Sequence, residues 1–186
     1  MKEKLLIKSR AIYFLIICIL LITITGCSDN KREDVVSYVL KQIYQAPDSE
    51  LITLSEKMTD DIEKAAMDQS DIALEDSEFF KYLAKRYEDY ITPECYEKLI
   101  SQRIPYKYHE SMAELGYTME VASIDIDKNS SSANIYDFTV DLSFGPAENE
   151  EKNIKIVGSA QFEKKGNRIN FLRLIDEDLQ KELEEQ

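Results

Sequence analysis

The spacing of hydrophobic residues changes near Tyr117 of this 186-residue chain, and this change limits the fold more than any other feature. Before Tyr117, apolar residues recur at steps of three and four, which is the period of an amphipathic α-helix. After it, they alternate with polar residues, which is the period of a strand with one buried face. A run of helices followed by a run of strands predicts an α+β fold in which N-terminal helices pack on an antiparallel sheet.

Four helices are predicted in the first part of the chain. Their ranges are 35–44, 49–66, 79–91 and 92–104. The start of the fourth is marked by Thr92, a favourable N-cap residue, and by Pro93 at the first helical position, where no backbone N–H is needed. The acidic stretch 68–78 has a weaker period, so we expect it to be largely a loop.

Four strands are predicted in the second part. Their ranges are 117–127, 136–144, 154–163 and 169–175. Short connections join them in order, which predicts a curved four-stranded antiparallel sheet. The alternation shifts near Ala122, where we expect a β-bulge. Two alternatives stay open for the acidic end 176–186, which forms either a short terminal helix or a fraying tail.

The first 27 residues have the features of a processed leader. Four basic residues and one acid open the chain, and residues 11–25 follow as an uncharged run of the length found in signal peptides. As a helix this run would extend about 22 Å at roughly 1.5 Å per residue, less than the ~30 Å hydrocarbon core of a bilayer. A cleaved signal is therefore favoured over a permanent span.

The apolar run ends in Ile24-Thr25-Gly26-Cys27, which resembles the lipobox of bacterial lipoproteins. In that family the cysteine sulfur receives a diacylglyceryl group, and signal peptidase cuts directly before the cysteine. The resemblance implies a signal peptide at 1–26 and lipid, such as palmitate chains, on Cys27. Two acyl chains suffice for stable attachment, so the protein is expected on the extracytoplasmic face of the cell membrane. The alternatives are a plain secretory signal with a chance cysteine, or a short retained helix.

The rest of the chain has the length of one domain. Residues 27–32 are polar and are predicted as a short lipidated tether, which would reach about 10 to 20 Å if extended. Residues 33–186 are predicted as a single domain, because no repeat, long Gly/Ser linker or Pro-rich tract divides them.

Charge limits the partners of this domain. Beyond residue 27 the chain has 19 basic and 35 acidic residues, a net charge of −16. Such a surface disfavours nucleic acid and repels anionic lipid head groups. Most of these acids are expected on solvated helix faces, although divalent cations or basic partners would also be attracted.

Cysteine usage favours a domain without disulfides. After removal of the leader and lipidation of Cys27, only Cys95 remains, so no intrachain disulfide can form. Cys95 lies between Glu94 and Tyr96 in a helical pattern, far in sequence from the histidine. We therefore expect a packed helix residue and not a nucleophile.

The helical segment Tyr87-x-x-Tyr-Ile-Thr-Pro-Glu-Cys-Tyr-Glu-Lys-Leu99, followed by four strands, resembles the NTF2-like lipoproteins of Gram-positive bacteria. The resemblance covers most of residues 33–176. It implies helices packed on the concave face of a strongly bent sheet, forming a cone with a pocket. The enzymes of this superfamily that the chain resembles, ketosteroid isomerase and scytalone dehydratase, place Asp, His or Tyr inside the cone.

The sequence offers few candidates for such chemistry. His109 is the single histidine and is expected in a loop or on a helix surface, while Asp137 and Asp141 fall on the polar face of their strand. Without a catalytic constellation, we expect a non-catalytic binding or assembly module that needs no cofactor and engages an envelope protein or a small ligand. The alternative is an isomerase-like or dehydratase-like enzyme that uses the cone pocket.

One segment has the oxygen spacing of a calcium loop. It reads Asp125-x-Asp127-x-Asn129-x-Ser131. That loop requires Gly at its sixth position and Glu at its twelfth, where this chain has Ser130 and Tyr136. A polar turn between two strands is therefore predicted here, and no metal site.

Overall fold

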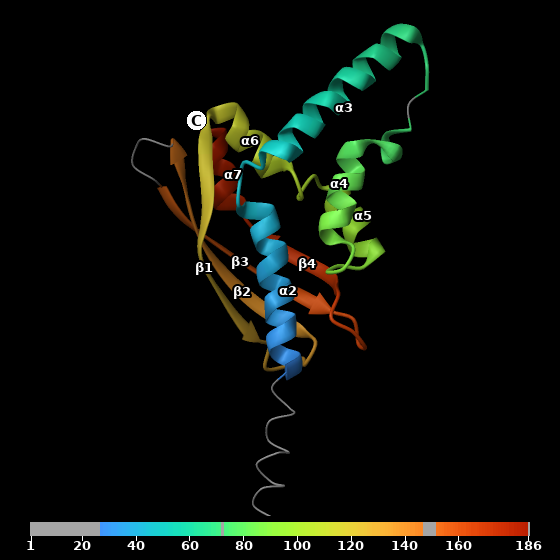
Figure 1. Ribbon diagram of the computed structural model, residues 1–186. Coiled ribbons are helices and arrows are strands. Elements are labelled where there is room, and N and C mark those ends of the chain that lie inside the picture. The colour runs from blue at the N-terminus through green and yellow to red at the C-terminus, as the bar shows by residue number, and fades with distance from the viewer. Residues whose placement is uncertain (1–26, 72, 147–151, 186) are drawn as a thin grey trace, which may run out of the picture.

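The computed structural model describes residues 27–71, 73–146 and 152–185, and this part of the chain has the expected α+β architecture (Figure 1). In these described residues, six α-helices accompany one four-stranded antiparallel sheet. In chain order the elements are α2 (Cys27–Tyr44), α3 (Ser49–Asp68), the 3₁₀ turn η1 (Leu74–Asp76), α4 (Glu78–Tyr87), α5 (Pro93–Ser101), α6 (Lys107–Leu115), β1 (Tyr117–Lys128), β2 (Ile135–Pro146), β3 (Lys152–Phe162), β4 (Ile169–Ile175) and α7 (Glu177–Glu184).

The sheet is the simple meander that the alternation predicted. Its strand order is β1-β2-β3-β4, and each neighbour is antiparallel. The register of β1 against β2 shifts between Val121 and Ser123, which confirms the bulge expected at Ala122. Of the two alternatives for the C-terminal end, the helix is correct, since α7 follows β4 directly.

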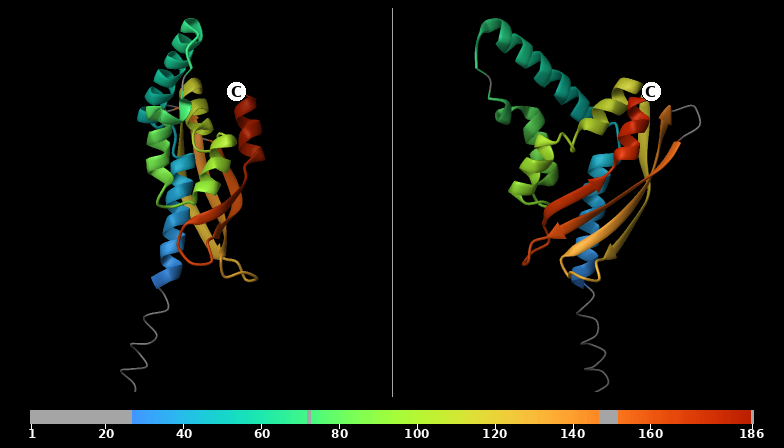
Figure 2. Two further views of the ribbon diagram at one scale, coloured as in Figure 1. Left: turned by 90° about the vertical axis from the view of Figure 1, so that its right-hand side faces the viewer. Right: turned by 180° about the vertical axis from the view of Figure 1, so that it is seen from behind.

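The domain core lies between one face of the sheet and the helical layer. Every second residue of β2 is buried and points toward the helices, from Tyr136 to Phe144, whereas the intervening residues are exposed or half-exposed. Helix α2 runs along this face (Figures 1 and 2) and buries a stripe of apolar side chains completely. This stripe consists of Val36, Val39, Leu40 and Ile43. The fold thus places the inner-face side chains of β2 in the core, while others on this face, such as Ile124 and Ile126 of β1, are half-buried against it.

The backbone also ties the helical layer to both edges of the sheet. After α2, Ala46 exchanges two hydrogen bonds with Met119 on β1, with N···O distances of 2.9 and 2.7 Å. After α4, the Ile169 amide of β4 donates to Tyr90, and Thr92 donates to Ile169, at 2.8 and 2.9 Å. Each edge strand therefore forms backbone hydrogen bonds at one position with the segment that follows a helix.

The structure adds regular secondary structure at the start of the domain. Residues 27–32, predicted as a short lipidated tether, form the first turns of α2, which begins at Cys27. Arg32 packs with its guanidinium 5.1 Å from the ring centroid of Phe162, and its Nη2 donates to the carbonyl of Gly166 at 2.9 Å. Arg32 thus links the first turns of α2 to the two neighbouring turns of the sheet.

A further helix, α6, was not predicted. It starts after the turn that follows Pro105 and ends at Gly116, whose φ of 66° provides the left-handed C-cap. Its buried side chains include Tyr108 and Met112, four residues apart on one face. Two turns of helix give too short a pattern to be distinguished from a loop by periodicity.

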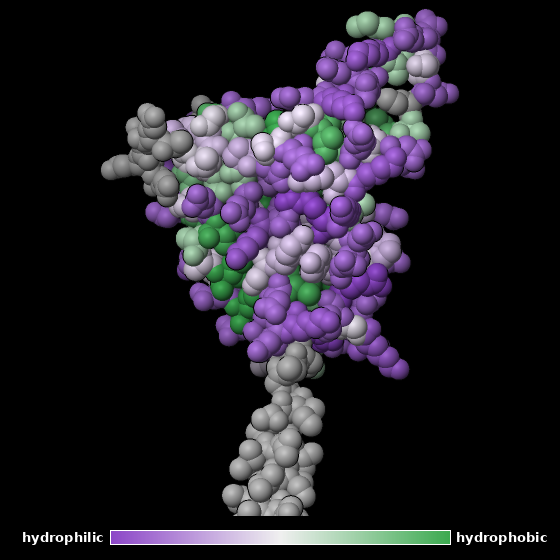
Figure 3. Space-filling model, viewed as in Figure 1, coloured by the Kyte–Doolittle hydropathy of each residue, from purple (hydrophilic) through white to green (hydrophobic). Residues whose placement is uncertain are grey.

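Helix α3 leaves the body of the domain as an arm, which we define as residues 59–68. Ala65 is the one half-buried residue of the arm, and the other nine are exposed, with Met67 80 % and Ile62 38 % exposed. Figure 3 shows that the visible surface of the arm is mostly hydrophilic. In the described residues no helix combines the length and apolar character that crossing a membrane requires.

Candidate binding site

A polar cluster inside the domain forms around Asp176, the residue between β4 and α7. Its side chain is buried, with the whole residue 8 % exposed. The hydroxyl of Tyr108 donates to Asp176 Oδ2, and the amide of Gln180 donates to Oδ1 at 2.7 Å. The ammonium of Lys107 lies 3.4 Å from Oδ2. Helices α6 and α7 thus bring three donors to a single carboxylate.

This cluster forms one wall of an open pocket of about 370 Å³, which is within the usual size range of small-molecule sites. Lys98 and Arg173 line it together with Lys107, so three basic side chains surround one carboxylate. Its apolar lining includes Phe171, whose ring centroid lies 4.6 Å from the Lys98 ammonium. The pocket therefore suits a small polar or anionic molecule better than a cation.

The Tyr108 hydroxyl remains a hydrogen-bond donor at all ordinary pH values. Burial, the nearby Tyr44 and the bond to Asp176 together raise the pKa of Tyr108 far above its usual value. Both oxygens of Asp176 already accept hydrogen bonds. The cluster is thus organised to hold the carboxylate in one position.

Tyr44 lies against this cluster without joining it. Its ring centroid is 5.4 Å from that of Tyr108, and its hydroxyl is fully buried. In the described part of the chain, this hydroxyl has no hydrogen-bond partner. Burial, followed by the charge of Asp176, raises the pKa of Tyr44 well above its usual value. A buried hydroxyl without a partner typically costs about 1 to 3 kcal/mol.

His109 is not the surface residue that the sequence suggested. It is completely buried on α6. Its Nδ1 accepts from the Asp48 amide at 3.0 Å, so Nε2 carries the proton and donates to the Gln42 carbonyl at 2.9 Å. Both nitrogens are therefore used to fasten the connection between α2 and α3. The prediction was wrong because no helix was expected at residues 107–115, and α6 turns His109 inward.

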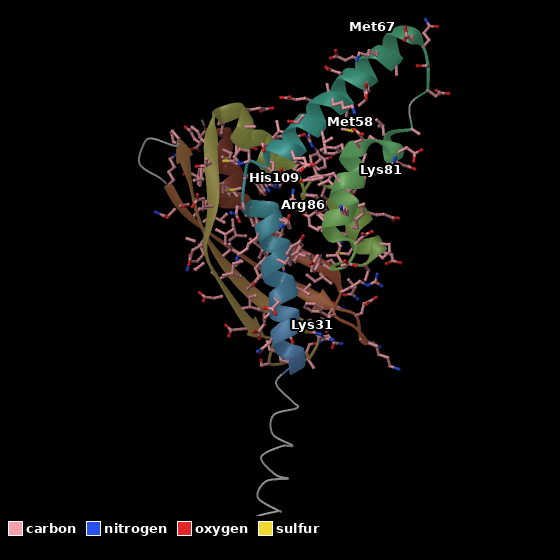
Figure 4. All side chains as sticks on the ribbon, viewed as in Figure 1. Lys31, Met58, Met67, Lys81, Arg86 and His109 are labelled. Carbon is pink, nitrogen blue, oxygen red and sulfur yellow. The ribbon has the colours of Figure 1, made fainter. Side chains whose placement is uncertain are left out.

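A second polar cluster, centred on Asp48, supports this connection, and Figure 4 labels Arg86 from this cluster together with His109. Asp48 Oδ1 caps α3 by accepting from the Leu51 amide at 3.1 Å, while Oδ2 accepts from Arg86 and from the Tyr82 hydroxyl. Burial opposes ionisation of Asp48, but the Leu51 amide and then the Arg86 guanidinium outweigh it and lower the pKa of Asp48. Arg86 also donates to Gln42 of α2. The cluster joins three helices and does not face the pocket around Asp176.

Cys95 is a packed helix residue, as the sequence predicted. It is 4 % exposed, and its amide donates to the Thr92 hydroxyl, which confirms the expected N-cap. Burial raises the pKa of the Cys95 thiol to about 11. The thiol is therefore protonated and a poor nucleophile near neutral pH.

The segment with calcium-like spacing forms the polar turn predicted for it. Asn129 Oδ1 accepts from the Ser131 amide at 2.9 Å, and its Nδ2 donates to Asp137 at 2.7 Å. Asp125 and Asp127 are exposed on β1. Within the described ranges, no three His, Cys, Asp or Glu side chains come together in a way that would hold a metal ion.

The polar face of β2 also lies where it was expected. Asp137 is exposed, and Asp141 pairs with Lys155 on β3 at 3.2 Å while accepting from Ser123 at 2.8 Å. Both acids face away from the helices and from the cluster around Asp176.

The predicted lipid-attachment residue, Cys27, lies at the start of α2 and is not part of the cluster around Asp176.

The cluster around Asp176 was not predicted from the sequence, because Asp176 and Tyr108 are 68 residues apart and belong to no local motif. One signal was present in the sequence: Pro105 and Gly116 bracket a segment whose Tyr108 and Met112 have helical spacing.

Comparisons of the chain with protein-family models, with curated proteins and with solved structures find no match. The fold defines the class, an α+β protein with helices on one face of an antiparallel meander. Resemblance to NTF2-like proteins and to lipoproteins remains a prediction from the sequence.

Stability should depend on pH through His109. Burial lowers the pKa of His109, so the unfolded chain, with a histidine pKa of about 6.5, binds a proton that the folded protein does not. Unfolding free energy should therefore fall as the pH drops below about 6.5, by up to ~1.4 kcal/mol per pH unit. Urea unfolding from pH 7.5 to 5 measures this slope in the wild type and in His109→Gln, which cannot titrate. Equal slopes in both proteins would contradict the buried neutral imidazole.

Two tyrosine substitutions should have opposite effects. Tyr44→Phe removes a hydroxyl that has no partner and should leave stability unchanged or raise it by about 1 kcal/mol. Tyr108→Phe removes a donor from buried Asp176 and should lower stability by about 1 to 3 kcal/mol. Thermal and urea unfolding of both variants provide the comparison. A larger loss in Tyr44→Phe than in Tyr108→Phe would show that the polar cluster is organised differently.

Proposed function

We propose that this chain is a lipid-anchored module on the extracytoplasmic face of the cell membrane, where it binds a partner or ligand without transforming it. The observation that carries the proposal is the position of Cys27. This residue ends the lipobox-like segment and also begins α2, the helix that packs along the whole sheet. Lipid on Cys27 would hold the domain through a helix and not through a loose linker.

The apolar core of the described residues supports a binding role over catalysis inside a cone. Side chains of the inner sheet face, such as Val140 and Leu142, are fully buried in the same core as α2. Large aromatic residues, including Tyr136, Phe144 and Phe162, are also buried there. The enzymes of the resembling superfamily need an open cone, whereas the pocket beside Asp176 opens at the side of this domain, between α5, β4 and α7.

The arm of α3 supports contact with an envelope protein. Its residues are exposed on nearly all sides, and Met67 presents a large apolar side chain to solvent. A helix that is polar around most of its circumference gains little from its own domain, and one role for such a helix is to bridge to another surface.

One observation favours the alternative, an isomerase-like or dehydratase-like enzyme. A carboxylate, a phenol and an ammonium converge at Asp176, Tyr108 and Lys107, and these groups can act in proton transfer. Against this role, both oxygens of Asp176 already accept hydrogen bonds from side chains of the protein itself, Tyr108 and Gln180.

Replacement of the lipobox cysteine tests the anchor. Cys27→Ala should move the protein from washed membranes to the soluble fraction, because no acyl chains can be attached. Cys18→Ala changes a cysteine outside the lipobox and should leave the protein in membranes. Intact-mass spectrometry of wild-type protein should show loss of residues 1–26 and a mass gain on Cys27. A free thiol at Cys27 in native protein would overturn the proposal.

A photocrosslinking amino acid at Met67 tests the binding role. With the anchored protein in intact envelopes, it should give a discrete adduct of higher mass on irradiation. The same amino acid at Glu120, an exposed position on β1, serves as the control and should give none. Equal labelling at both positions, or none at Met67, would contradict a partner on the arm.

A further inference from the structure

Basic residues gather at the end of the domain where α2 begins. We call this surface the basic tip and define it as residues 30–32 of α2, 128–134 around the β1–β2 turn, and 163–168 around the β3–β4 turn. It contains six basic residues and one acid, whereas the whole chain has 23 basic and 36 acidic residues. Its basic members are Lys31, Arg32, Lys128, Lys164, Lys165 and Arg168. Basic residues thus outnumber acids within these three segments, while Asp29, Glu33 and Asp127 adjoin them in sequence and Asp137 accepts a hydrogen bond from Asn129.

Arg32 joins the three segments into one surface. From α2, its guanidinium reaches both turns and lies over the Phe162 ring. Its acceptors are the carbonyl of Ala133 (3.4 Å), the side chain of Asn134 (3.4 Å) and the carbonyls of Glu163 (3.4 Å) and Gly166 (2.9 Å). Figure 4 shows Lys31, the preceding residue, at the same end of α2. The position of the turns relative to residue 27 is therefore fixed by direct contacts.

The lysines of the tip face solvent. Arg32 is engaged as described, and Arg168 pairs with Glu163, the single acid of the tip, at 3.3 Å. The side chains of Lys31, Lys128, Lys164 and Lys165 are exposed. Between them lie small polar residues, Ser130 to Ser132 and Gly166, and no large apolar side chain. Such a surface suits contact with charged head groups and not insertion into hydrocarbon.

The basic tip lies close enough to residue 27 to interact electrostatically with a membrane surface at that residue. Arg32 lies five residues after Cys27 in α2, which corresponds to about 8 Å at 1.5 Å per residue. This is close to the Debye length of about 8 Å at physiological ionic strength. Lysines at this height would therefore feel the surface potential of a membrane that holds residue 27.

We propose that the basic tip docks on anionic phospholipid head groups, so that the domain stands upright on the membrane with its acidic body and the α3 arm directed away. The inference rests on the membrane attachment in the proposed function. It adds an orientation, because anionic lipids attract the tip and repel the remaining surface. The attraction acts together with the lipid as a second membrane signal.

The test uses full-length protein purified from membranes and reconstituted in vesicles. A fluorescent amino acid replaces Ser131, an exposed residue of the tip, and nitroxide-labelled head groups quench it on contact. Quenching should be about twofold or more stronger in vesicles that contain phosphatidylglycerol than in pure phosphatidylcholine, and the difference should disappear at high salt.

Two triple variants separate the position of charge from its amount. The tip variant Lys128→Glu/Lys164→Glu/Lys165→Glu should be quenched equally in the two kinds of vesicle. The control variant Lys64→Glu/Lys81→Glu/Lys181→Glu makes the same change of charge on α3, α4 and α7. It should still be quenched more strongly in vesicles that contain phosphatidylglycerol. Circular dichroism establishes that both variants fold. Equal quenching in both kinds of vesicle, or equal behaviour of the two variants, would overturn the proposal.

Failure of this inference can be distinguished from failure of the anchor. The quenching measurement reports contact between the tip and head groups whether acyl chains or an uncleaved leader hold residue 27. Intact mass reports lipidation by itself. Quenching of the probe at Ser131 in a protein without lipid on Cys27 would refute the anchor and support docking of the basic tip. Lipid on Cys27 without quenching of the probe would support the anchor and refute docking of the tip.

Discussion

The burial of α2 against the inner face of the sheet is the interaction on which the rest of the structure depends. Its apolar stripe, including Val39 and Ile43, is completely removed from solvent and belongs to the same hydrophobic core as the buried side chains of β2. Hydrophobic burial of this kind is roughly proportional to the apolar area removed from water. Polar contacts then fix both ends of the helix: Arg32 reaches two turns of the sheet, and Gln42 accepts from His109.

This arrangement separates the domain into regions of different chemistry. The start of α2 lies with the basic turns of the sheet, while the α3 arm extends from the other end (Figure 1). The pocket beside Asp176 lies on a third region, between α5, β4 and α7. A net negative charge alone predicts repulsion from anionic lipids, yet the folded chain presents lysines at the end nearest residue 27. The distribution of charge, and not its sum, decides which face can approach a membrane.

Much of the fold follows from local patterns. Period-two alternation predicted all four strands, and its interruption predicted the bulge at Ala122, because a strand with one buried face imposes its alternation on the sequence. Thr92 and Pro93 predicted the start of α5 through capping chemistry that acts within one turn. The pattern failed at α6, where two turns give too few repeats, and therefore His109 was assigned to the wrong environment. Asp176 was seen as the start of an acidic tail because its partner Tyr108 lies 68 residues away.

The sequence by itself determined the class of fold, the lipobox-like segment at Cys27 and the packed state of Cys95, because each is encoded in the period or identity of neighbouring residues. Tertiary structure alone decided that Tyr108 and Lys107 meet Asp176, that His109 is buried and neutral, and that basic residues from three segments form one surface. Each of these depends on contacts between distant parts of the chain. Such contacts arise only when α2 and the sheet close around a common core, since hydrogen bonds and burial depend on distance in space and not on distance along the chain.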